Sequence, residues 1–453
     1  MAGMAHASST GAGPSEAGSP DRGTTELDGS RGDVTGRLLE FIDASPSPFH
    51  AIESATAILQ SAGAKEVSRL DRWDDSTGAR FVVRDGAMVA WYHTEGKDPA
   101  SPFRLVGAHT DSPNLRIKPR PDTGQAGYRQ LGVEVYGGAL VNSWLDRDLG
   151  LSGRLSLVDG TTRLVRIDRP LLRVAQLAIH LDRQVDEGLV LDRQRHITPI
   201  WGLGAPRPGE LRDFLAAELD VEAPAVAAWD LMCHDLTPAR RLGADDELYA
   251  APRIDNLASC HAATEALARV ISGEEPDAVV PLICLFDHEE VGSVSPSGAV
   301  GPLLGEVIER LVLARGGDRE DVLRALAGSW LVSADGAHAA HPNYLDRYEP
   351  DHHVFLNGGP VIKSNANGRY ASDAPGVAMF RAVCESAGVP AQQYVHRSNL
   401  ACGSTIGPLS AAKLGVATVD VGSAQLSMHS ARELGGAADP PLLTAALAAF
   451  LGK

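Results

Sequence analysis

The stretch Val279-Val280-Pro281-Leu282-Ile283-Cys284-Leu285-Phe286-Asp287-His288-Glu289-Glu290-Val291-Gly292-Ser293 joins an apolar run to two adjacent carboxylates. The run is typical of an interior strand covered on both faces, and Gly292 with the Ser and Pro residues after it indicates a loop. Glu289 and Glu290 therefore fall at the carboxyl end of a strand, the edge where open α/β sheets bind ligands. Neighbouring side chains on an extended segment point in opposite directions, so the two glutamates can serve different partners, such as a metal and a water. A solvated acidic turn is the alternative that an isolated Glu-Glu pair leaves open.

Length and composition limit the possible classes of protein. The 453 residues, 44% of them hydrophobic, are enough for two or three domains with a substantial core. The formal net charge of −17 disfavours nucleic acid and anionic membrane surfaces as partners. The five cysteines are odd in number, widely spread and without a Cys-x-x-Cys pair, which is typical of a reducing compartment and argues against sulfur-ligated zinc. Because the sequence also shows no bilayer-spanning apolar stretch and no signal-peptide core, we expect a cytoplasmic protein.

Changes of pattern along the chain predict three parts. Residues 1–32 are rich in Gly, Ser, Ala and Thr with almost no large apolar side chains, so we expect a disordered tail. Between residues 120 and 246, short alternating apolar segments with Gly and charged turns predict β-strands. Because candidate metal ligands flank this region on both sides, we interpret it as a mainly β domain inserted into an α/β catalytic domain made of residues 33–119 and 247–453.

Further segments place histidine or carboxylate side chains at or just beyond the ends of predicted strands. His109 and Asp111 follow one apolar strand, and in a His-x-Asp pair the imidazole can bind a metal while the carboxylate orients it. Asp335 ends a second apolar segment, and His429 lies in a loop after a third. Asp255 comes just before a helix, where helix capping is an adequate structural role. On spacing alone, a purely structural histidine is an equal alternative for His109.

Together these segments supply three carboxylates and two histidines, which suit two zinc ions or similar divalent metals with one shared carboxylate. Two metals about 3.5 to 4 Å apart polarise a carbonyl and lower the pKa of a shared water towards about 7. Glu289, the glutamate left over, is then the candidate base that takes the proton from that water. A thermolysin-like His-Glu-x-x-His helix is excluded, because Gly292 stands where the second histidine is needed. The candidate metal ligands are His109, Asp255, Glu290, Asp335 and His429.

Five motifs in this order carry a resemblance to a known family: His109-Thr110-Asp111-Ser112-Pro113, Arg253-Ile254-Asp255-Asn256, Asp287-His288-Glu289-Glu290-Val291-Gly292-Ser293, Ser333-Ala334-Asp335-Gly336-Ala337-His338-Ala339-Ala340-His341-Pro342-Asn343 and Ser427-Met428-His429-Ser430-Ala431-Arg432-Glu433. By these motifs, the chain from about Val34 onward resembles the aspartyl aminopeptidase family of dinuclear-zinc metallopeptidases. The resemblance implies an α/β catalytic domain with a mixed sheet, an inserted dimerisation domain, and a tetrahedral dodecamer whose active sites face an inner chamber. It also implies that Asp255 bridges the two metal ions and that Glu289 is the general base.

The same resemblance implies a substrate class, short peptides with an N-terminal Asp or Glu, and places substrate contacts on His180, His338, Lys363 and Tyr370. From the residues alone, His180 in its apolar run is more typical of a core histidine, and Lys363 and Tyr370 are typical of a polar surface loop. His180 lies in the inserted domain, so it is expected to reach the site of a neighbouring subunit. Two other functions stay open. A related aminopeptidase of different specificity would lack a cation at position 363, and an inactive assembly scaffold would have lost Glu289 or a metal ligand.

Overall fold

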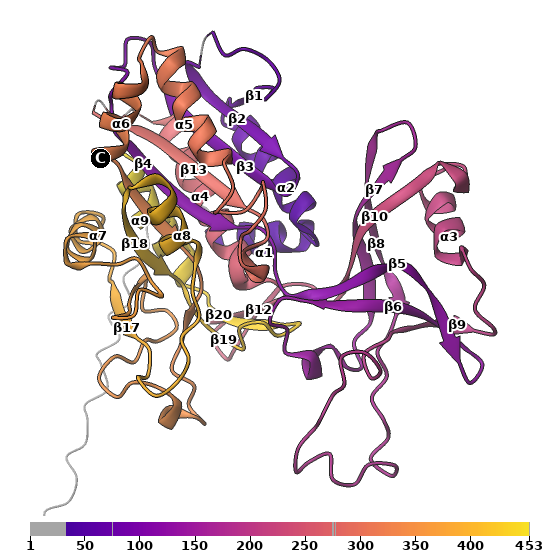
Figure 1. Cartoon of the computed structure of the whole chain (residues 1–453). Coiled ribbons are helices and arrows are strands. Elements are labelled where there is room, and N and C mark those ends of the chain that lie inside the picture. Colours follow the sequence, from indigo (N-terminus) through magenta and orange to yellow (C-terminus); the bar gives the residue numbers. More distant parts are fainter. Residues whose placement is uncertain (1–32, 75, 274–275, 277, 453) are drawn as a thin grey trace, which may run out of the picture. The chain divides into compact units, whose positions relative to one another are not determined.

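The largest sheet in the described part of the chain is a nine-stranded mixed sheet (Figure 1). The computed structural model describes residues 33–452 except 75, 274, 275 and 277, so the tail expected over residues 1–32 lies outside the described residues. From Val34 onward the chain forms one compact unit. The strands of the sheet, in spatial order, are β1 (Lys65–Glu66), β2 (Gly78–Arg84), β3 (Ala87–His93), β13 (Val280–Phe286), β4 (Phe103–His109), β14 (Trp330–Ala334), β18 (Ala417–Gly422), β16 (Val361–Ser364) and β17 (Gln392–Val395).

The middle of this sheet is parallel and buried on both faces. β4 pairs in parallel with β13 on one side and with β14 on the other, and β14 pairs in parallel with β18. Every residue of β13 is buried, which confirms the prediction made from its continuous apolar run. The carboxyl ends of these four strands therefore meet at one edge of the sheet.

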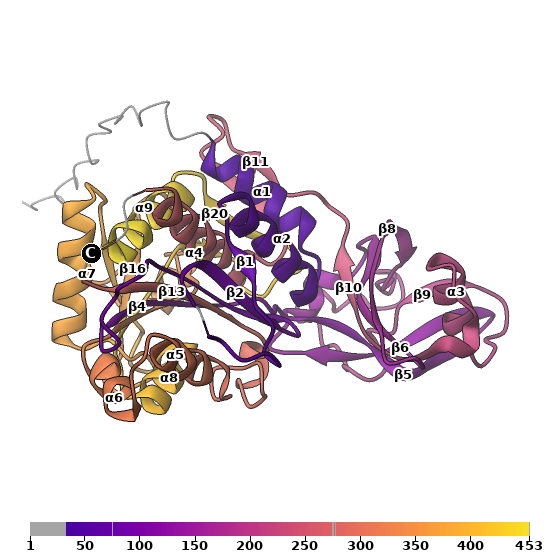
Figure 2. The ribbon, with the colours of Figure 1, turned by 90° about the horizontal axis from the view of Figure 1, so that it is seen from above.

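Helices cover both faces of the sheet, as Figure 2 shows from above. Small residues make up much of α4 and α9, so these two helices pack closely against each other and the sheet. The helices of the first layer are α1 (Val34–Ala44), α2 (Pro48–Ser61), α4 (Ile254–Ser272), α7 (Ala374–Ser386) and α9 (Asp439–Leu451). Those of the second layer are α5 (Leu303–Ala314), α6 (Arg319–Ala327) and α8 (Ile406–Leu414).

In sequence, a six-stranded antiparallel sheet lies between strands β4 and β13 of the nine-stranded sheet, and it has its own hydrophobic core. Leu211 and Leu215 of α3 (Glu210–Glu218) are fully buried in this core. The strands, in spatial order, are β8 (Thr162–Leu172), β7 (Leu149–Leu157), β10 (Val226–Asp235), β5 (Asn114–Gln125), β6 (Tyr128–Tyr136) and β9 (Ile200–Leu203). The α/β class, the mixed sheet and a separate mainly β module are thus confirmed.

Short elements complete the described part of the chain. A five-stranded sheet contains β11 (Arg240–Leu242), β12 (Leu248–Ala251), β20 (Glu433–Gly436), β19 (Ala424–Leu426) and β15 (Ala337–His338). Single turns of 3₁₀ helix are η2 (Val141–Trp144), η3 (Ala223–Ala225), η4 (Glu289–Val291) and η5 (Leu345–Arg347). Among the described residues, no helix combines the length and the apolar character needed to cross a membrane.

One local expectation is wrong. The sequence around Lys363 was expected to form a polar surface loop, but Val361–Ser364 is strand β16, and the Lys363 side chain is almost fully buried. The reason is pairing on both sides, since β16 lies between β18 and β17. The loop begins only after Ser364.

Candidate active site

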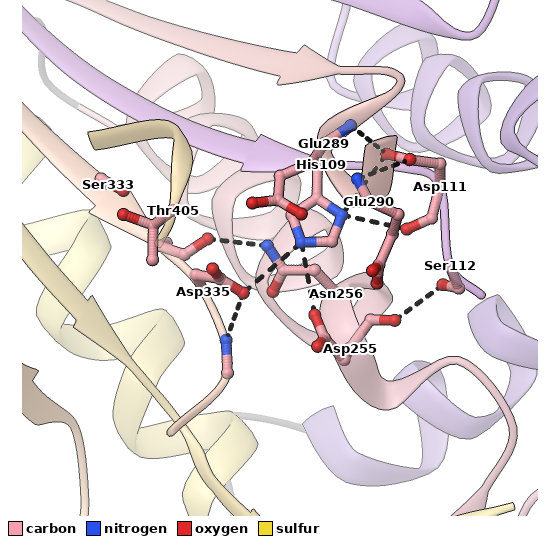
Figure 3. A network of polar contacts seen from close by, with 12 residues as sticks. His109, Asp111, Ser112, Asp255, Asn256, Glu289, Glu290, Ser333, Asp335 and Thr405 are labelled. Carbon is pink, nitrogen blue, oxygen red and sulfur yellow. Dashed lines mark hydrogen bonds and ion pairs between the residues drawn. The ribbon is translucent and has the colours of Figure 1, made fainter. Parts of the chain in front are cut away.

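Three adjacent strands and two turns bring the five candidate ligands to one edge of the nine-stranded sheet. His109 is the last residue of β4, Glu290 lies in η4 just after β13, and Asp335 directly follows β14. Asp255 lies in the first turn of α4, and His429 lies in the turn between β19 and β20. Figure 3 shows the side chains of His109, Asp255 and Asp335 pointing toward one another. The strand-end positions read from the sequence therefore do converge.

The five residues form two groups that share Asp255. In the first group, His109 Nε2 lies 3.3 Å from Asp255 Oδ1 and 3.4 Å from Asp335 Oδ1. In the second, His429 Nε2 lies 3.3 Å from Asp255 Oδ2 and 3.4 Å from Glu290 Oε1. Within each group, the candidate ligand atoms all lie within 4.8 Å of one another. One oxygen of Asp255 thus faces each group, which is the arrangement of a carboxylate that bridges two cations.

In each of the two imidazole rings, Nδ1 makes a hydrogen bond, and this bond determines the protonation of Nε2, the nitrogen that faces the carboxylates. His109 Nδ1 donates to the main-chain oxygen of Asp111 at 2.9 Å, and His429 Nδ1 donates to that of Gly138 at 3.2 Å. A carbonyl oxygen only accepts, so in a neutral ring each Nε2 presents a lone pair to the carboxylates. Lone pairs and carboxylate oxygens repel each other, whereas a divalent cation between them binds both. The geometry of the two rings therefore fits a metal.

Burial makes this collection of carboxylates costly without a counter-charge. Asp255 Oδ1 and Glu290 Oε1 are buried and have no hydrogen-bond donor in the described part of the chain. Burial raises the pKa of Glu290 well above its usual value and that of Glu289 to about 8. Buried carboxylates need neutralising partners, and oxygen and imidazole nitrogen donors of this kind suit zinc.

Two buried carboxylates outside these groups hold the main chain of the site. Asp111 accepts hydrogen bonds from the main-chain N–H groups of residues 289 and 290 at 3.0 and 3.1 Å (Figure 3). Glu433 accepts from the main-chain N–H groups of His429 at 2.7 Å and Asp255 at 3.0 Å. Asp111 was expected to orient His109 through its carboxylate. Its Oδ1 lies 3.5 Å from His109 Nδ1, while the shorter contact to that ring is made by its main-chain oxygen.

Three residues in or next to the ligand groups have an unusual backbone conformation. Arg253, His288 and His429 have φ values of 57°, 65° and 68°, in the left-handed region that residues with a Cβ rarely adopt. Such conformations persist only where the surroundings hold them, and they cluster at functional sites. Here Arg253 is held by two hydrogen bonds to main-chain oxygens of Ser45 and Ile42, each 3.1 Å long.

Three of the four predicted substrate contacts lie beside the ligand groups. Lys363 Nζ donates to the main-chain oxygen of Gly336 at 3.0 Å and lies 3.9 Å from Asp335 Oδ2. The same ammonium lies 5.1 Å from the centre of the Tyr370 ring. His338 lies in β15, three residues after Asp335 in sequence. Burial, with a further contribution from Lys363, lowers the pKa of His338 to about 4, so this ring is neutral at physiological pH.

His180 lies apart from these residues. It is exposed and lies in the segment 173–199 between β8 and β9. Among the described residues, the strand pairing of this segment consists of two isolated bridges at its start. Its neighbours Ile179 and Leu181 are 47% and 74% exposed. The interpretation of His180 as a core histidine is therefore wrong, and the structure does not bring it to the ligand groups of its own chain.

Two residues that the sequence analysis gave no role are built into the site. The Tyr136 hydroxyl donates to Asp111 Oδ2 at 2.7 Å. Asp420, fully buried in β18, accepts 2.6 Å hydrogen bonds from the hydroxyls of Ser333 and Thr405. For Asp420 the available signal was a carboxylate inside an apolar strand. For Tyr136 the only signal was its place at the end of a predicted strand before two glycines, and this does not indicate a contact with Asp111.

The fold is of the α/β class, and its two groups of histidine and carboxylate side chains are those expected of a metalloenzyme. A family model described as "Aminopeptidase I zinc metalloprotease (M18)" matches residues 41–451. The chain belongs to this M18 family, and its activity is that of a zinc aminopeptidase.

Relatives and solved structures agree with this membership. A "Probable M18 family aminopeptidase 2" of Streptomyces avermitilis is 57% identical over 419 residues, 92% of this chain and 97% of the relative. The protein of the same name from Mycobacterium tuberculosis is 53% identical over 423 residues, 91% and 97% of the two chains. The solved structure titled "Cryo-EM structure of the Ape4 and Nbr1 complex" is similar with a TM-score of 0.89 and 35% identity, covering 93% of this chain and 85% of that chain. The S. cerevisiae mApe1 dodecamer is similar with a TM-score of 0.80 and 27% identity, covering 92% and 96%.

Proposed function

We propose that this zinc aminopeptidase releases N-terminal aspartate or glutamate from short peptides. The observation that carries the proposal is the position of Lys363. The ligand groups place three carboxylates in a chain of net charge −17, so an acidic substrate side chain would be repelled unless a fixed cation met it. Among the described residues, two of the three N–H donors of Lys363 are used by main-chain oxygens of Asp335 and Gly336. The third donor is then available for a substrate carboxylate.

The metal-binding residues follow from the two groups. His109 and Asp335 would hold one zinc ion, Glu290 and His429 would hold a second, and Asp255 would bridge the two. Bound zinc supplies Lewis acidity, which polarises the scissile carbonyl and makes a water more acidic. The unpaired buried oxygens of Asp255 and Glu290 support this assignment.

Glu289 is proposed as the general base. Its main-chain N–H is held by Asp111, and its carboxyl lies close enough to His109 and Asp335 for their charges to affect its pKa. Divalent cations nearby favour its carboxylate form, which is the form that accepts a proton. Glu289 then takes the proton from the attacking water and passes it to the leaving amine.

The chain is proposed to work as a homo-oligomer, with a tetrahedral dodecamer as the assembly. Supporting observations are the similarity to the mApe1 dodecamer and the apolar side chains of segment 173–199, among which Leu177 is 58% and Val190 is 86% exposed. The mainly β module would form the dimer contact, and His180 would enter the site of a neighbouring subunit. The five cysteines, all free, support a cytoplasmic location.

The Lys363→Ala variant tests the specificity. A hydrogen bond to a charged group is worth about 1.5 to 3 kcal/mol, so kcat/KM for an aspartyl chromogenic substrate is expected to fall by roughly 10- to 150-fold. Turnover of a leucyl substrate, which never used that bond, should change little. Lys413→Ala is the matched control, because Lys413 is an exposed lysine near the end of α8.

Wild-type protein assayed on aspartyl, glutamyl and leucyl substrates, with and without a chelator, separates the alternatives. Activity on acidic substrates that a chelator abolishes is the expected result. Preference for the leucyl substrate would identify an M18 aminopeptidase of other specificity. Equal losses on both substrates in Lys363→Ala would mean that this lysine only holds the main chain of Asp335 and Gly336.

A further inference from the structure

The end of strand β6 connects the six-stranded module to the metal site. Tyr136 is the last residue of β6, and its hydroxyl donates to Asp111 Oδ2 at 2.7 Å. The ring itself is fixed from the module side, because the Arg116 guanidinium of β5 lies 3.8 Å from the ring centre. Burial and the nearby Asp111 raise the pKa of the Tyr136 hydroxyl, so it keeps its proton and donates.

The Asp111 carboxylate that accepts from Tyr136 also binds the main chain of the two glutamates. Its carboxylate is fully buried and accepts from the N–H groups of residues 289 and 290 at 3.0 and 3.1 Å. Oδ2 is shared between the Tyr136 hydroxyl and the N–H of Glu290. His288, which precedes this pair, has left-handed backbone, so η4 depends on outside contacts for its position.

The two glycines that follow Tyr136 fit closely against the same site. A Cβ built on Gly137 would lie 3.1 Å from the Cβ of Glu290. The main-chain oxygen of Gly138 accepts from His429 Nδ1 at 3.2 Å. Three consecutive residues of the module therefore contact the metal site, and only Tyr136 does so through a side chain.

We propose that Tyr136 is a positioning residue for the reaction: its hydroxyl fixes the Asp111 carboxylate, which sets the main-chain position of Glu289. The inference rests on the proposed role of Glu289 as the general base. The module that is proposed to build the oligomer thus also aligns the base, and it does so from within the same chain. Because proton transfer is sensitive to small displacements, a misplaced base lowers kcat, while contacts that bind the peptide are kept.

Tyr136→Phe is the test, because it removes one hydroxyl and keeps the ring on Arg116. We expect kcat to fall by about 10- to 100-fold, as small misplacements of catalytic groups do, with KM within about twofold of wild type on any accepted substrate. Zinc content, melting temperature and sedimentation coefficient should stay at wild-type values. Tyr128→Phe is the matched control, since Tyr128 begins the same strand, is 44% exposed and should leave kcat unchanged.

A double-mutant cycle with Glu289→Gln distinguishes the two proposals. If Tyr136 acts through Glu289, the double variant has the kcat of Glu289→Gln alone. Full independent losses in the double variant, an unchanged kcat in Tyr136→Phe, or a loss that comes with lower zinc content or melting temperature would each overturn the positioning role. A Glu289→Gln variant that keeps wild-type kcat would instead overturn the proposed base.

Discussion

The edge of the nine-stranded sheet and the segment 173–199 present their polar side chains in opposite ways. At the sheet edge, His109 is 1% and Asp255 4% exposed, and each has partners from distant parts of the same chain. In the segment, His180 is exposed among apolar side chains such as Leu181, which is 74% exposed. Apolar groups left exposed together mark surfaces that another molecule covers. The candidate metal ligands all come from a single chain, whereas we expect the exposed segment to be covered by a second copy.

The variant with the largest expected effect tests the candidate metal ligands at the sheet edge. Asp255→Asn removes the carboxylate that both ligand groups share, so zinc content measured by metal analysis should fall sharply, and activity should fall to background. Asp439→Asn is the matched control, because Asp439 is also a buried aspartate but accepts from main-chain N–H groups of Asn357 and Gly359. If both variants keep their zinc, Asp255 is not a ligand.

Glu289→Gln should have the next largest effect. The base is not assigned as a ligand, so zinc content is expected to stay near wild type while kcat falls by about 10² to 10⁴, the range for lost general acid–base catalysis. Metal analysis and steady-state kinetics on the same preparation provide the measurement. If Glu289→Gln instead loses zinc, and the sites that keep zinc have a normal kcat, then Glu289 is the ligand and Glu290 the base.

His180→Ala tests the exposed segment and should have the smallest effect. Loss of one hydrogen bond to a charged group predicts a roughly 10- to 150-fold lower kcat/KM, with no change in melting temperature because the side chain is exposed. His196→Ala is the control, since His196 is an exposed histidine of the same segment.

Mixed assemblies sharpen the same test. In co-expressed oligomers of His180→Ala and Glu289→Gln chains, the His180 of a Glu289→Gln subunit can enter the site of a His180→Ala neighbour, whose Glu289 is intact. Recovery of activity above the sum of the two homo-oligomers is expected. Without recovery, His180 acts within its own chain or not at all, and the comparison between the two regions fails.

Much of the sheet edge could be predicted from the sequence, because its signals are local. The apolar run before Glu289 and Glu290 predicts a buried strand that ends at a ligand, and the structure has this strand as β13. The same argument places His109 and Asp335 at strand ends, where they lie. The convergence of His109, Glu290 and Asp335 follows from parallel neighbours whose carboxyl ends meet at one edge.

What could not be predicted depends on contacts between distant residues. Nothing local indicates that the Tyr136 hydroxyl contacts the Asp111 carboxylate or that Glu433 holds the main chain of Asp255. The sequence around Lys363 predicts a polar loop, whereas its burial in a four-residue strand comes from pairing partners elsewhere in the chain. The exposure of His180 could not be predicted either, because its neighbours Ile179 and Leu181 are apolar and yet are exposed.

The pairing of β4 with β13 has a consequence for how the enzyme matures. β4 ends at His109 and its neighbour β13 begins at Val280, so the whole six-stranded module is synthesised between two strands that must lie side by side. Closing such a long loop is slow, and the module, whose strands are close in sequence, is expected to fold on the nascent chain first. His429 leaves the ribosome last of the five proposed ligands. The full set of proposed ligands therefore exists only after His429 has been synthesised, and a translation product that ends before His429 would have the six-stranded module but lack one proposed zinc ligand.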